Sequence, residues 1–201
     1  FAIEKAKDAF EKWKNTTGKE RGILIRRWHE LILENIDDLS LIMTLENGKP
    51  ILDSRGEIIY SSLFTDWFAE EAKRTYGKTI PSTVSGRRIL TIKQPVGVCG
   101  IITPWNFPAA MITRKVAPAL AAGCTVVIKP AATTPFSATA LIELADRAGF
   151  PAGVINLVSV SEKDVAEVGN ELCMNKIVRK ISFTGSTKVG KTLTFCKISN
   201  T

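Results

Sequence analysis

The feature that most constrains the fold is a series of short, continuous apolar segments that alternate with helical patterns from residue 96 onward. The apolar segments are Val98–Ile102, Thr125–Ile128, Gly153–Val158 and Ile177–Phe183. The helical patterns are Ala109–Ala122, Ser137–Ala148, Glu162–Cys173 and Ser186–Cys196. Strands without polar alternation are buried on both faces, and helices of this length connect parallel strands. We therefore expect an α/β fold: a Rossmann-like parallel sheet covered by helices on both faces.

The part of the chain before residue 78 predicts helices. Apolar residues recur at helical spacing in three stretches, the last stopped by Gly48 and Pro50. A longer helix is expected from Leu52 to Tyr76. Its inward residues are expected to be Ile59, Leu63, Trp67 and residues 69–72.

Short β-rich runs separated by proline and glycine follow, and they predict strands. The predicted organisation has three parts: residues 1–77 are helical, residues 78–95 carry a pair of strands, and residues 96–201 form the α/β core.

Charge and composition narrow the classes of partner. The 27 Lys and Arg residues exceed the 20 Asp and Glu residues, but they are scattered among acidic residues and form no basic stripe with aromatics. We therefore expect no nucleic-acid partner. No apolar run is long enough for a membrane span, so no membrane association is expected. With His29 as the single histidine, we expect no metal site.

The cysteines indicate a reducing compartment. Cys99, Cys124, Cys173 and Cys196 form no C-x-x-C pair and no framework of paired spacings. The expected location is the cytoplasm, or the mitochondrial matrix if an import peptide has been removed.

One motif points to a different function. Residues 185–192 read GSTKVGKT, which satisfies the phosphate-binding P-loop pattern, with Lys191 and Thr192 for phosphate and magnesium. Only nine residues follow Thr192, too few for a further strand with a magnesium-binding carboxylate. A P-loop NTPase is thus a remote alternative. Gly185 and Gly190 would equally let a dinucleotide phosphate approach the start of a helix.

Polar turns follow three of the expected strands. They read TPWNFP at 103–108, KPAATTPFSA at 129–138 and TGST at 184–187. In an open parallel sheet, ligands bind beyond the carboxyl ends of the strands. We therefore expect these turns to face one crevice.

In this order and spacing, the three motifs resemble the aldehyde dehydrogenase superfamily. The similarity covers nearly the whole chain but less than half of a family member. Within the superfamily, the most similar members are succinate-semialdehyde dehydrogenases, on the stretches TLENGKP, GEIIYSSLFTDWFAEEAKR, AMITRK, KPAATTPFSA and AGFPAGVINLV. The resemblance implies NAD(P)-dependent oxidation of an aldehyde to a carboxylic acid, here succinate semialdehyde to succinate in GABA degradation.

The resemblance also implies roles for individual residues. Asn106 matches the asparagine that stabilises the oxyanion, although an asparagine here can also cap the following helix. Lys129 matches the contact to the adenosine ribose, Gly185 and Ser186 the pyrophosphate contacts, and Gly169 a glycine near the adenine. The full set of implied cofactor contacts is Thr103, Pro104, Trp105, Asn106, Lys129, Ala131, Ala132, Gly169, Phe183, Thr184, Gly185 and Ser186.

Two positions bear on specificity. Many NAD-using relatives carry a glutamate at the position of Ala132, and its absence leaves room for a 2′-phosphate, so NADP is expected over NAD. Arg114 matches the arginine that binds the distal carboxylate of the substrate, a task suited to the guanidinium fork. The alternative is a surface arginine or one paired with a helix carboxylate.

The resemblance also has implications for the catalytic nucleophile and base and for the oligomeric state. None of the cysteines stands in the context of the family's nucleophile, and the nucleophile and the glutamate base are expected downstream of this chain. A catalytically inactive dinucleotide-binding fragment is therefore the second hypothesis. Residues 81–93 resemble the family's oligomerisation arm, so a homo-oligomer is expected for the full-length enzyme.

Overall fold

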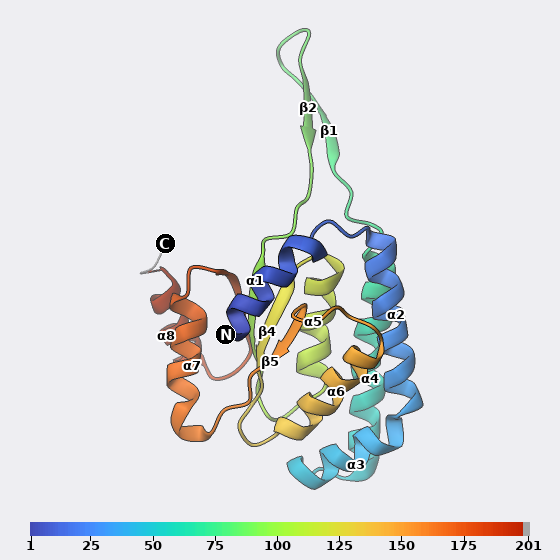
Figure 1. Ribbon diagram of the computed structural model, residues 1–201, viewed down its shortest axis with the longest axis vertical. Coiled ribbons are helices and arrows are strands. Elements are labelled where there is room, and N and C mark those ends of the chain that lie inside the picture. The colour runs from blue at the N-terminus through green and yellow to red at the C-terminus, as the bar shows by residue number, and fades with distance from the viewer. Residues whose placement is uncertain (199–201) are drawn as a thin grey trace.

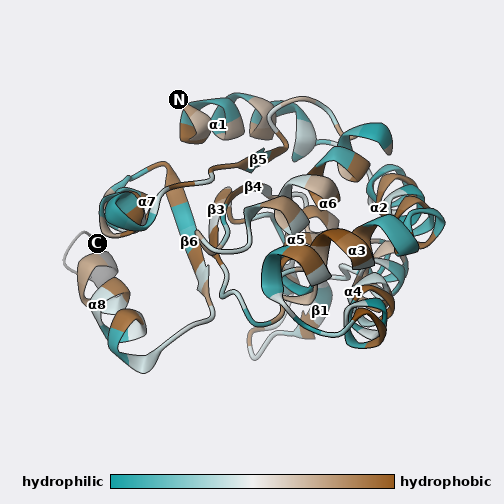
Figure 2. Ribbon diagram, turned by 90° about the horizontal axis from the view of Figure 1, so that it is seen from below, coloured by the Kyte–Doolittle hydropathy of each residue, from teal (hydrophilic) through white to brown (hydrophobic). Residues whose placement is uncertain are grey.

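The computed structural model describes residues 1–198; residues 199–201 of the expected core segment lie outside the described residues. A parallel sheet forms the middle layer, and a long hairpin projects away from the body (Figure 1). Viewed from below, α1 covers one face of the sheet and the layer containing α5 covers the other (Figure 2). This confirms the α/β fold expected from the alternating pattern.

The sheet has four strands: β3 (Val98–Ile102), β4 (Thr125–Lys129), β5 (Ile155–Leu157) and β6 (Val178–Phe183). Their order is β5-β4-β3-β6, and every neighbouring pair is parallel. At the carboxyl end of β3, Ile102 is in register with Lys129 on one side and with Phe183 on the other. The strand order reverses at β3, because β4 and β5 lie to one side of it and β6 to the other.

Alternate residues of β3 pack into two separate hydrophobic cores. Cys99 and Ile101 face the core that contains the residues of α2 to α6. Val98 and Ile102 face a smaller core with Ile3 of α1 and residues of α7 and α8. Both faces of the strand are therefore removed from water, which explains why its sequence is apolar throughout.

The helices are α1 (Ala2–Trp13), α2 (Gly18–Glu34), α3 (Ile36–Asn47), α4 (Ile51–Glu71), α5 (Ala110–Ala121), α6 (Pro135–Arg147), α7 (Val165–Met174) and α8 (Thr187–Ile198), with a short 3₁₀ helix at Glu162–Asp164. Thr17 begins α2 with a capping box, in which its side chain and that of Glu20 satisfy each other's backbone N–H groups. Gly48 ends α3 with a left-handed φ of 80°, as its position in the sequence predicts.

The predicted inward face of α4 is wrong, apart from Ala69 and Ala72. Ile59, Leu63 and Trp67 are 45%, 55% and 64% exposed, and the helix ends at Glu71 rather than Tyr76. The residues that α4 buries are mostly small or polar: Ser54, Glu57, Ile58, Ser61, Ser62, Thr65 and Ala69. Because α4 packs closely against α2 and α5, small side chains are required where the backbones approach, and this requirement overrides the apolar periodicity.

The buried hydroxyls of α4 are hydrogen-bonded, Ser54 to Thr44 of α3 and others within the helix itself. Ser61 donates to the carbonyl of Ile58 at 2.8 Å, and Thr65 donates to that of Ser62 at 2.7 Å. A buried polar side chain costs little when it is hydrogen-bonded. A polar inward face is therefore compatible with the core.

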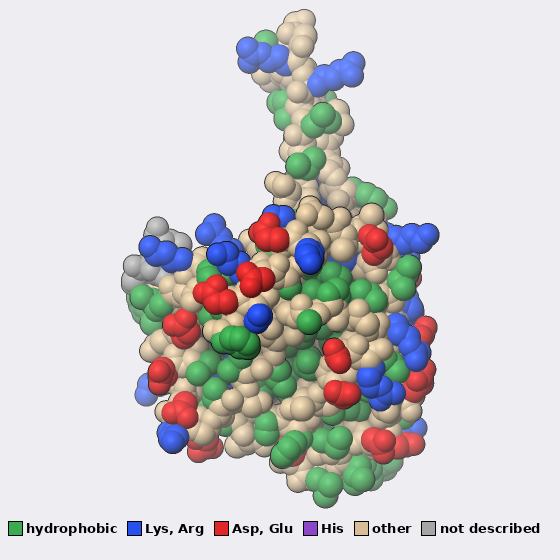
Figure 3. Space-filling model, in the orientation of Figure 1, with side chains coloured by type: hydrophobic (Ala, Val, Ile, Leu, Met, Phe, Trp, Pro, Cys, Tyr) green, Lys and Arg blue, Asp and Glu red, His purple; other side chains and the backbone are tan. Residues whose placement is uncertain are grey.

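The hairpin consists of β1 (Lys78–Pro81) and β2 (Arg88–Thr91), paired antiparallel with Lys78 opposite Thr91. Every residue of both strands is exposed, and basic side chains stand near its tip (Figure 3). Hydrophobic side chains gather at the opposite end, over α3, where Leu45 is 78% exposed. Among the described residues, no helix has the length and apolar character needed to cross a bilayer.

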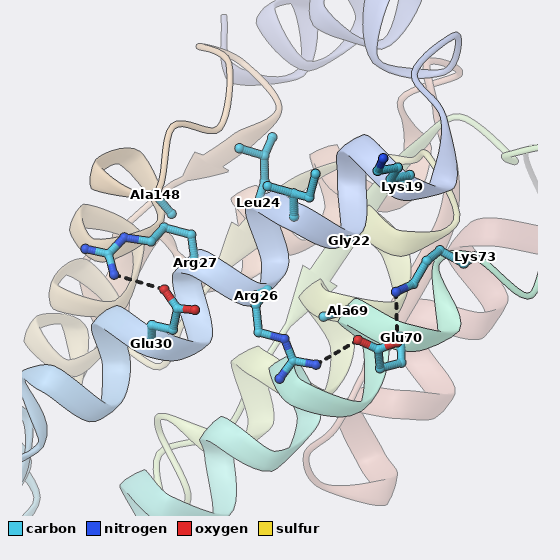
Figure 4. A pocket seen from close by; sticks show the side chains of 11 residues that line it. Lys19, Gly22, Leu24, Arg26, Arg27, Glu30, Ala69, Glu70, Lys73 and Ala148 are labelled. Carbon is cyan, nitrogen blue, oxygen red and sulfur yellow. Dashed lines mark hydrogen bonds and ion pairs between the residues drawn. The ribbon is translucent and has the colours of Figure 1, made fainter.

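The contact between α2 and α4 gives a matched pair of stability predictions. Figure 4 shows Gly22 of α2 and Ala69 of α4 where the two helices meet, beside the ion pairs that Glu70 forms with Arg26 and Lys73. A Cβ at Gly22 would stand 2.5 Å from the carbonyl oxygen of Ala69, whereas a Cβ at Gly56 of α4 would meet nothing within 4 Å.

Gly22→Ala is therefore expected to lower the free energy of unfolding by about 1–3 kcal/mol through overpacking. Gly56→Ala is expected to raise it by about 1 kcal/mol, because alanine is the better helix former. Urea unfolding of both variants measures the difference. Equal changes in the two variants would contradict the close backbone contact.

Candidate functional site

Main-chain hydrogen bonds join the three polar turns at the carboxyl edge of the sheet. The N–H of Thr103 donates to the carbonyl of Lys129 at 3.2 Å, and the N–H of Thr184 donates to the carbonyl of Ile102 at 3.1 Å. The turns after β3, β4 and β6 therefore lie side by side. Two of them, after β3 and β6, flank the point at which the strand order reverses, where open α/β sheets bind ligands.

The turn after β3 presents its side chains to solvent. Thr103 is buried and Pro104 half-buried, while Trp105, Asn106 and Phe107 are exposed. The side-chain amide of Asn106 makes no hydrogen bond within the described residues, so its donors are free for a ligand.

The alternative role of Asn106 as a helix cap is wrong. Helix α5 begins at Ala110 with Ala109 at the cap position and no side-chain cap of its own. The carboxylate of Glu57, from α4, accepts the hydrogen bonds of the Ala109 and Ala110 N–H groups instead.

Lys129 at the end of β4 carries a buried ammonium. The residue is 4% exposed, and its Nζ donates to the carbonyl of Pro130 at 2.8 Å. Burial lowers the pKa of this lysine. An ammonium has further donors beyond the one used here, so Lys129 fits ligand oxygen atoms such as the hydroxyls of a ribose. Ala131 and Ala132, directly beyond it, are half-buried.

The turn after β6 leads into the amino end of α8. A groove of about 830 Å³ lies there, lined by residues that include Phe183, Gly185, Ser186, Gly190 and Lys191. A Cβ on Gly185 would stand 2.5 Å from the Phe183 ring, so any larger residue here would have to displace this aromatic side chain. The first N–H groups of a helix have no partner within the helix, which suits an anion such as a pyrophosphate.

Gly169 lies apart from the strand ends. It is buried in α7, and a Cβ on it would stand 3.8 Å from Leu193 of α8. The structure thus places Gly169 at the contact between α7 and α8.

The P-loop alternative does not fit the structure. Because α8 begins at Thr187, Gly190, Lys191 and Thr192 stand inside the helix. The N–H of Gly190 donates to the carbonyl of Ser186 at 3.0 Å and is not free to cradle a phosphate, as a P-loop requires. The sequence matches the pattern, but the backbone does not form the loop.

Arg114 is exposed on α5 and packs on apolar neighbours. Its guanidinium lies 5.9 Å from the centroid of the Phe64 ring, and its Nη1 lies 3.8 Å from the sulfur of Met111. Within the described residues Arg114 pairs with no carboxylate, whereas other arginines such as Arg26 and Arg55 do. The expected alternative of a helix ion pair is therefore not found.

Several polar residues around the site carried no role in the sequence analysis. Lys115 is half-buried, and its Nζ lies 3.2 Å from the Ser182 hydroxyl, which joins α5 to β6. Burial, with the nearby charge of Arg114, lowers the pKa of Lys115. Asn47 and Lys49 donate to carbonyls of the turn after β3. For Asn47 and Lys49, the only signal in the sequence is the polar stretch TLENGKP. Its spacing does not predict their contacts with the turn after β3, which lies more than 50 positions away.

The cysteines lie away from these turns. Cys99 and Cys124 are buried near the amino ends of β3 and β4, the opposite edge of the sheet. A hydrogen bond with Cys124, together with burial, raises the pKa of the Cys99 thiol. Within residues 1–198, no group of three or more His, Cys, Asp or Glu side chains could hold a metal ion.

Comparisons with known proteins match this arrangement. The profile described as "Aldehyde dehydrogenase family" matches residues 1–198. The chain is 58% identical to the glutarate-semialdehyde dehydrogenase of Pseudomonas putida, over 96% of this chain and 39% of that protein. It is 59% identical to "Succinate-semialdehyde dehydrogenase [NADP(+)] 1" of Schizosaccharomyces pombe, over 96% and 38%.

A solved succinate-semialdehyde dehydrogenase from Burkholderia pseudomallei superposes with a TM-score of 0.96 at 52% identity, covering 99% of this chain and 41% of that one. The chain thus spans about two fifths of the length of the relatives it matches.

The buried ammonium of Lys129 gives a stability prediction. Its folded-state pKa is lowered, so the unfolded chain binds its proton more tightly and the charge destabilises the fold at neutral pH. Lys129→Met should raise the urea midpoint at pH 7. The gain should shrink as the pH rises toward about 10.4, where the unfolded lysine loses its proton. A gain that does not change with pH would contradict a charge effect.

Proposed function

The chain belongs to the aldehyde dehydrogenase family, and from this premise we propose that it is the cofactor-binding part of an enzyme that oxidises an aldehyde to a carboxylic acid with NAD(P)⁺. The observation that carries the proposal is the set of polar turns side by side at the carboxyl ends of β3, β4 and β6. The turns after β3 and β6 flank the reversal of strand order, where dinucleotides bind in sheets of this type.

The residues at these turns suit the parts of a dinucleotide. The free donors of Lys129 suit the adenosine ribose, and Gly169 lies between α7 and α8, where the adenine would lie. Gly185, Ser186 and the amino end of α8 suit the pyrophosphate. The residues Thr103, Pro104, Trp105, Asn106, Phe183 and Thr184 would enclose the nicotinamide, with Ala131 beside the ribose. The bound cofactor supplies the acceptor for the hydride of the substrate.

Asn106 is the chain's own contribution to the chemistry. In this proposal its side-chain amide donates to the oxygen of the attacked aldehyde carbon as negative charge develops there. One such donor contributes about 2.7–4 kcal/mol of transition-state stabilisation. Two observations support the role: the amide has no partner within the described residues, and the capping alternative is wrong.

We propose that the substrate is an aldehyde with a distal carboxylate, namely succinate semialdehyde, which would place the enzyme in GABA degradation. The support is Arg114, an exposed guanidinium without a carboxylate partner among the described residues, held against Phe64. The names of the relatives agree with an aldehyde of this class: one is a glutarate-semialdehyde and one a succinate-semialdehyde dehydrogenase.

NADP is the proposed cofactor in preference to NAD. Ala132 carries no charge at the position where a carboxylate would repel a 2′-phosphate, and the ammonium of Lys129 lies close along the same turn. One relative is itself named as an NADP⁺ enzyme.

The hairpin supports the proposal of a homo-oligomer. Both of its strands are exposed and carry unpaired outer edges, which are ready surfaces for strand pairing. Among the described residues, Cys99, Cys124 and Cys196 carry free thiols, which supports a reducing location, the cytoplasm or the mitochondrial matrix.

The second candidate is that residues 1–198 by themselves bind the dinucleotide without turnover. The support is that Cys99, Cys124 and Cys173 are buried and Cys196 half-buried, with the first two at the far edge of the sheet. Measurable cysteine-dependent oxidation of succinate semialdehyde by this chain alone would overturn it.

Arg114 gives the test of substrate class. In the full-length enzyme, Arg114→Leu is expected to raise KM for succinate semialdehyde by about 10–100-fold, since a hydrogen bond to a charged group contributes about 1.5–3 kcal/mol. KM for butanal, which has no carboxylate, should be unchanged. Arg147→Leu, at an exposed arginine at the end of α6, is the control. Equal effects of Arg114→Leu on both aldehydes would sink the assignment.

Ala132 gives the test of cofactor preference. Ala132→Glu should lower kcat/KM for NADP at least about tenfold relative to NAD, because the carboxylate repels the 2′-phosphate. Ala132→Gln has nearly the same shape without the charge and should keep most of the preference. A parent enzyme that favours NAD by tenfold or more would overturn the proposal.

A further inference from the structure

Side chains from a different part of the chain hydrogen-bond to the turn that carries Asn106. Asn47 Nδ2 donates to the carbonyl of Trp105 at 2.8 Å, and Lys49 Nζ donates to the carbonyl of Asn106 at 3.0 Å. Glu57 Oε1 accepts from the N–H groups of Ala109 at 2.9 Å and Ala110 at 3.2 Å. The turn is thus bound on both sides of Asn106 by side chains from the end of α3 to the start of α4, here called the clamp (Asn47, Lys49 and Glu57).

The clamp is one connected unit. The second oxygen of Glu57 accepts from Lys49 Nζ, in an ion pair whose side chains are 1% and 15% exposed. The ammonium of Lys49 also lies 4.7 Å from the centroid of the Phe107 ring. Lys49 therefore contacts the residue on the carboxyl side of Asn106, the carbonyl of Asn106 itself, and the carboxylate that binds the start of α5.

The hydrogen bonds of the clamp compensate for the cost of burying the Glu57 carboxylate. A carboxylate as buried as that of Glu57 is expensive to desolvate unless it is paired and fully hydrogen-bonded. Within residues 1–198, the Glu57 carboxylate is hydrogen-bonded by Lys49 and by the backbone N–H groups of Ala109 and Ala110. Helix α5 has no acidic residue in its first turn and no side-chain cap of its own, so Glu57 also supplies the negative charge that the amino end of a helix favours.

The orientation of Asn106 follows from these contacts. Its side chain makes no hydrogen bond within the described residues, so the direction of its amide depends on its backbone. An oxyanion donor must stand about 2.7–3.1 Å from the developing charge, and a misplacement of about 1 Å can cost about 100-fold in rate.

We propose that Asn47, Lys49 and Glu57 are positioning residues for the oxyanion donor Asn106. The inference rests on the proposed function, in which Asn106 stabilises the oxyanion. The clamp touches no substrate and acts through the backbone of residues 105–110.

The test is a double-mutant cycle in the full-length enzyme. Lys49→Met is expected to lower kcat by about 10–100-fold, with KM for the cofactor unchanged. In an Asn106→Ala background, the same Lys49→Met change should cause little further loss, because the group that it positions is already gone. Lys49→Arg, which can still donate to both oxygens, should recover most of kcat.

Further variants separate positioning from stability. Glu57→Gln keeps an acceptor for Ala109 and Ala110 but removes the charge opposite Lys49, so an intermediate loss is expected. Asn47→Ala deletes only the bond to Trp105 at a half-buried position and remains informative if Lys49→Met fails to fold. Arg55→Met, on the same helix as Glu57, removes an exposed ion pair with Asp37 of α3 and, as the control, should leave kcat unchanged.

Two results would overturn the inference: an unchanged kcat in Lys49→Met and Asn47→Ala, or losses that multiply in the double mutant with Asn106→Ala. A different result addresses the proposed function itself. If Asn106→Ala alone leaves kcat unchanged, Asn106 is not the oxyanion donor, and both the proposed role and the clamp's purpose fail together.

Discussion

The parallel pairing of β3 with a strand on each side is the constraint on which the rest of the structure depends. It places Ile102 in register with both Lys129 and Phe183, so the turns that follow the three strands emerge at the same edge. A strand buried on both faces needs helices on both faces, and the two hydrophobic cores on either side of β3 meet that need. The location of the candidate site is therefore set by the topology of the sheet, independently of any single polar side chain.

Helix α4 connects the helical layer to that site. Its small inward side chains let the backbone of α2 approach to the point where a Cβ at Gly22 would overlap Ala69. On the same inward face, Glu57 reaches the amino end of α5. Close packing and the polar contact thus have one origin: an inward face made of small and polar residues. Of the large apolar residues of α4, Ile58 is buried, whereas Ile59, Leu63 and Trp67 lie on the exposed face.

Sequence patterns were most informative where a local signal coincides with a structural requirement. The continuous apolar segments predicted β3 and β4, and Gly48 predicted the end of α3, because burial on both faces and a left-handed cap each restrict residue types directly. The adjacency of Thr103 and Lys129 followed from strand-end logic. The patterns failed where the same residues are compatible with two structures. The apolar periodicity of α4 predicted that the wrong face is buried. Asn106 was a candidate cap for α5, but Glu57 accepts the hydrogen bonds of its first N–H groups. The motif GSTKVGKT matches a phosphate-binding loop, but its second half lies inside α8.

The sequence by itself determined the α/β class, the positions of most strands and helices, the polar turns at the strand ends, and the resemblance to a family of dehydrogenases. These properties depend on residues that are near one another along the chain. Only the tertiary structure decided which face of α4 is buried, that the Asn106 amide has no hydrogen-bond partner within residues 1–198, and that Asn47, Lys49 and Glu57 hold its turn. Those contacts join residues more than 50 positions apart. Their existence depends on how closely α4 packs against α5, which no local spacing in the sequence specifies.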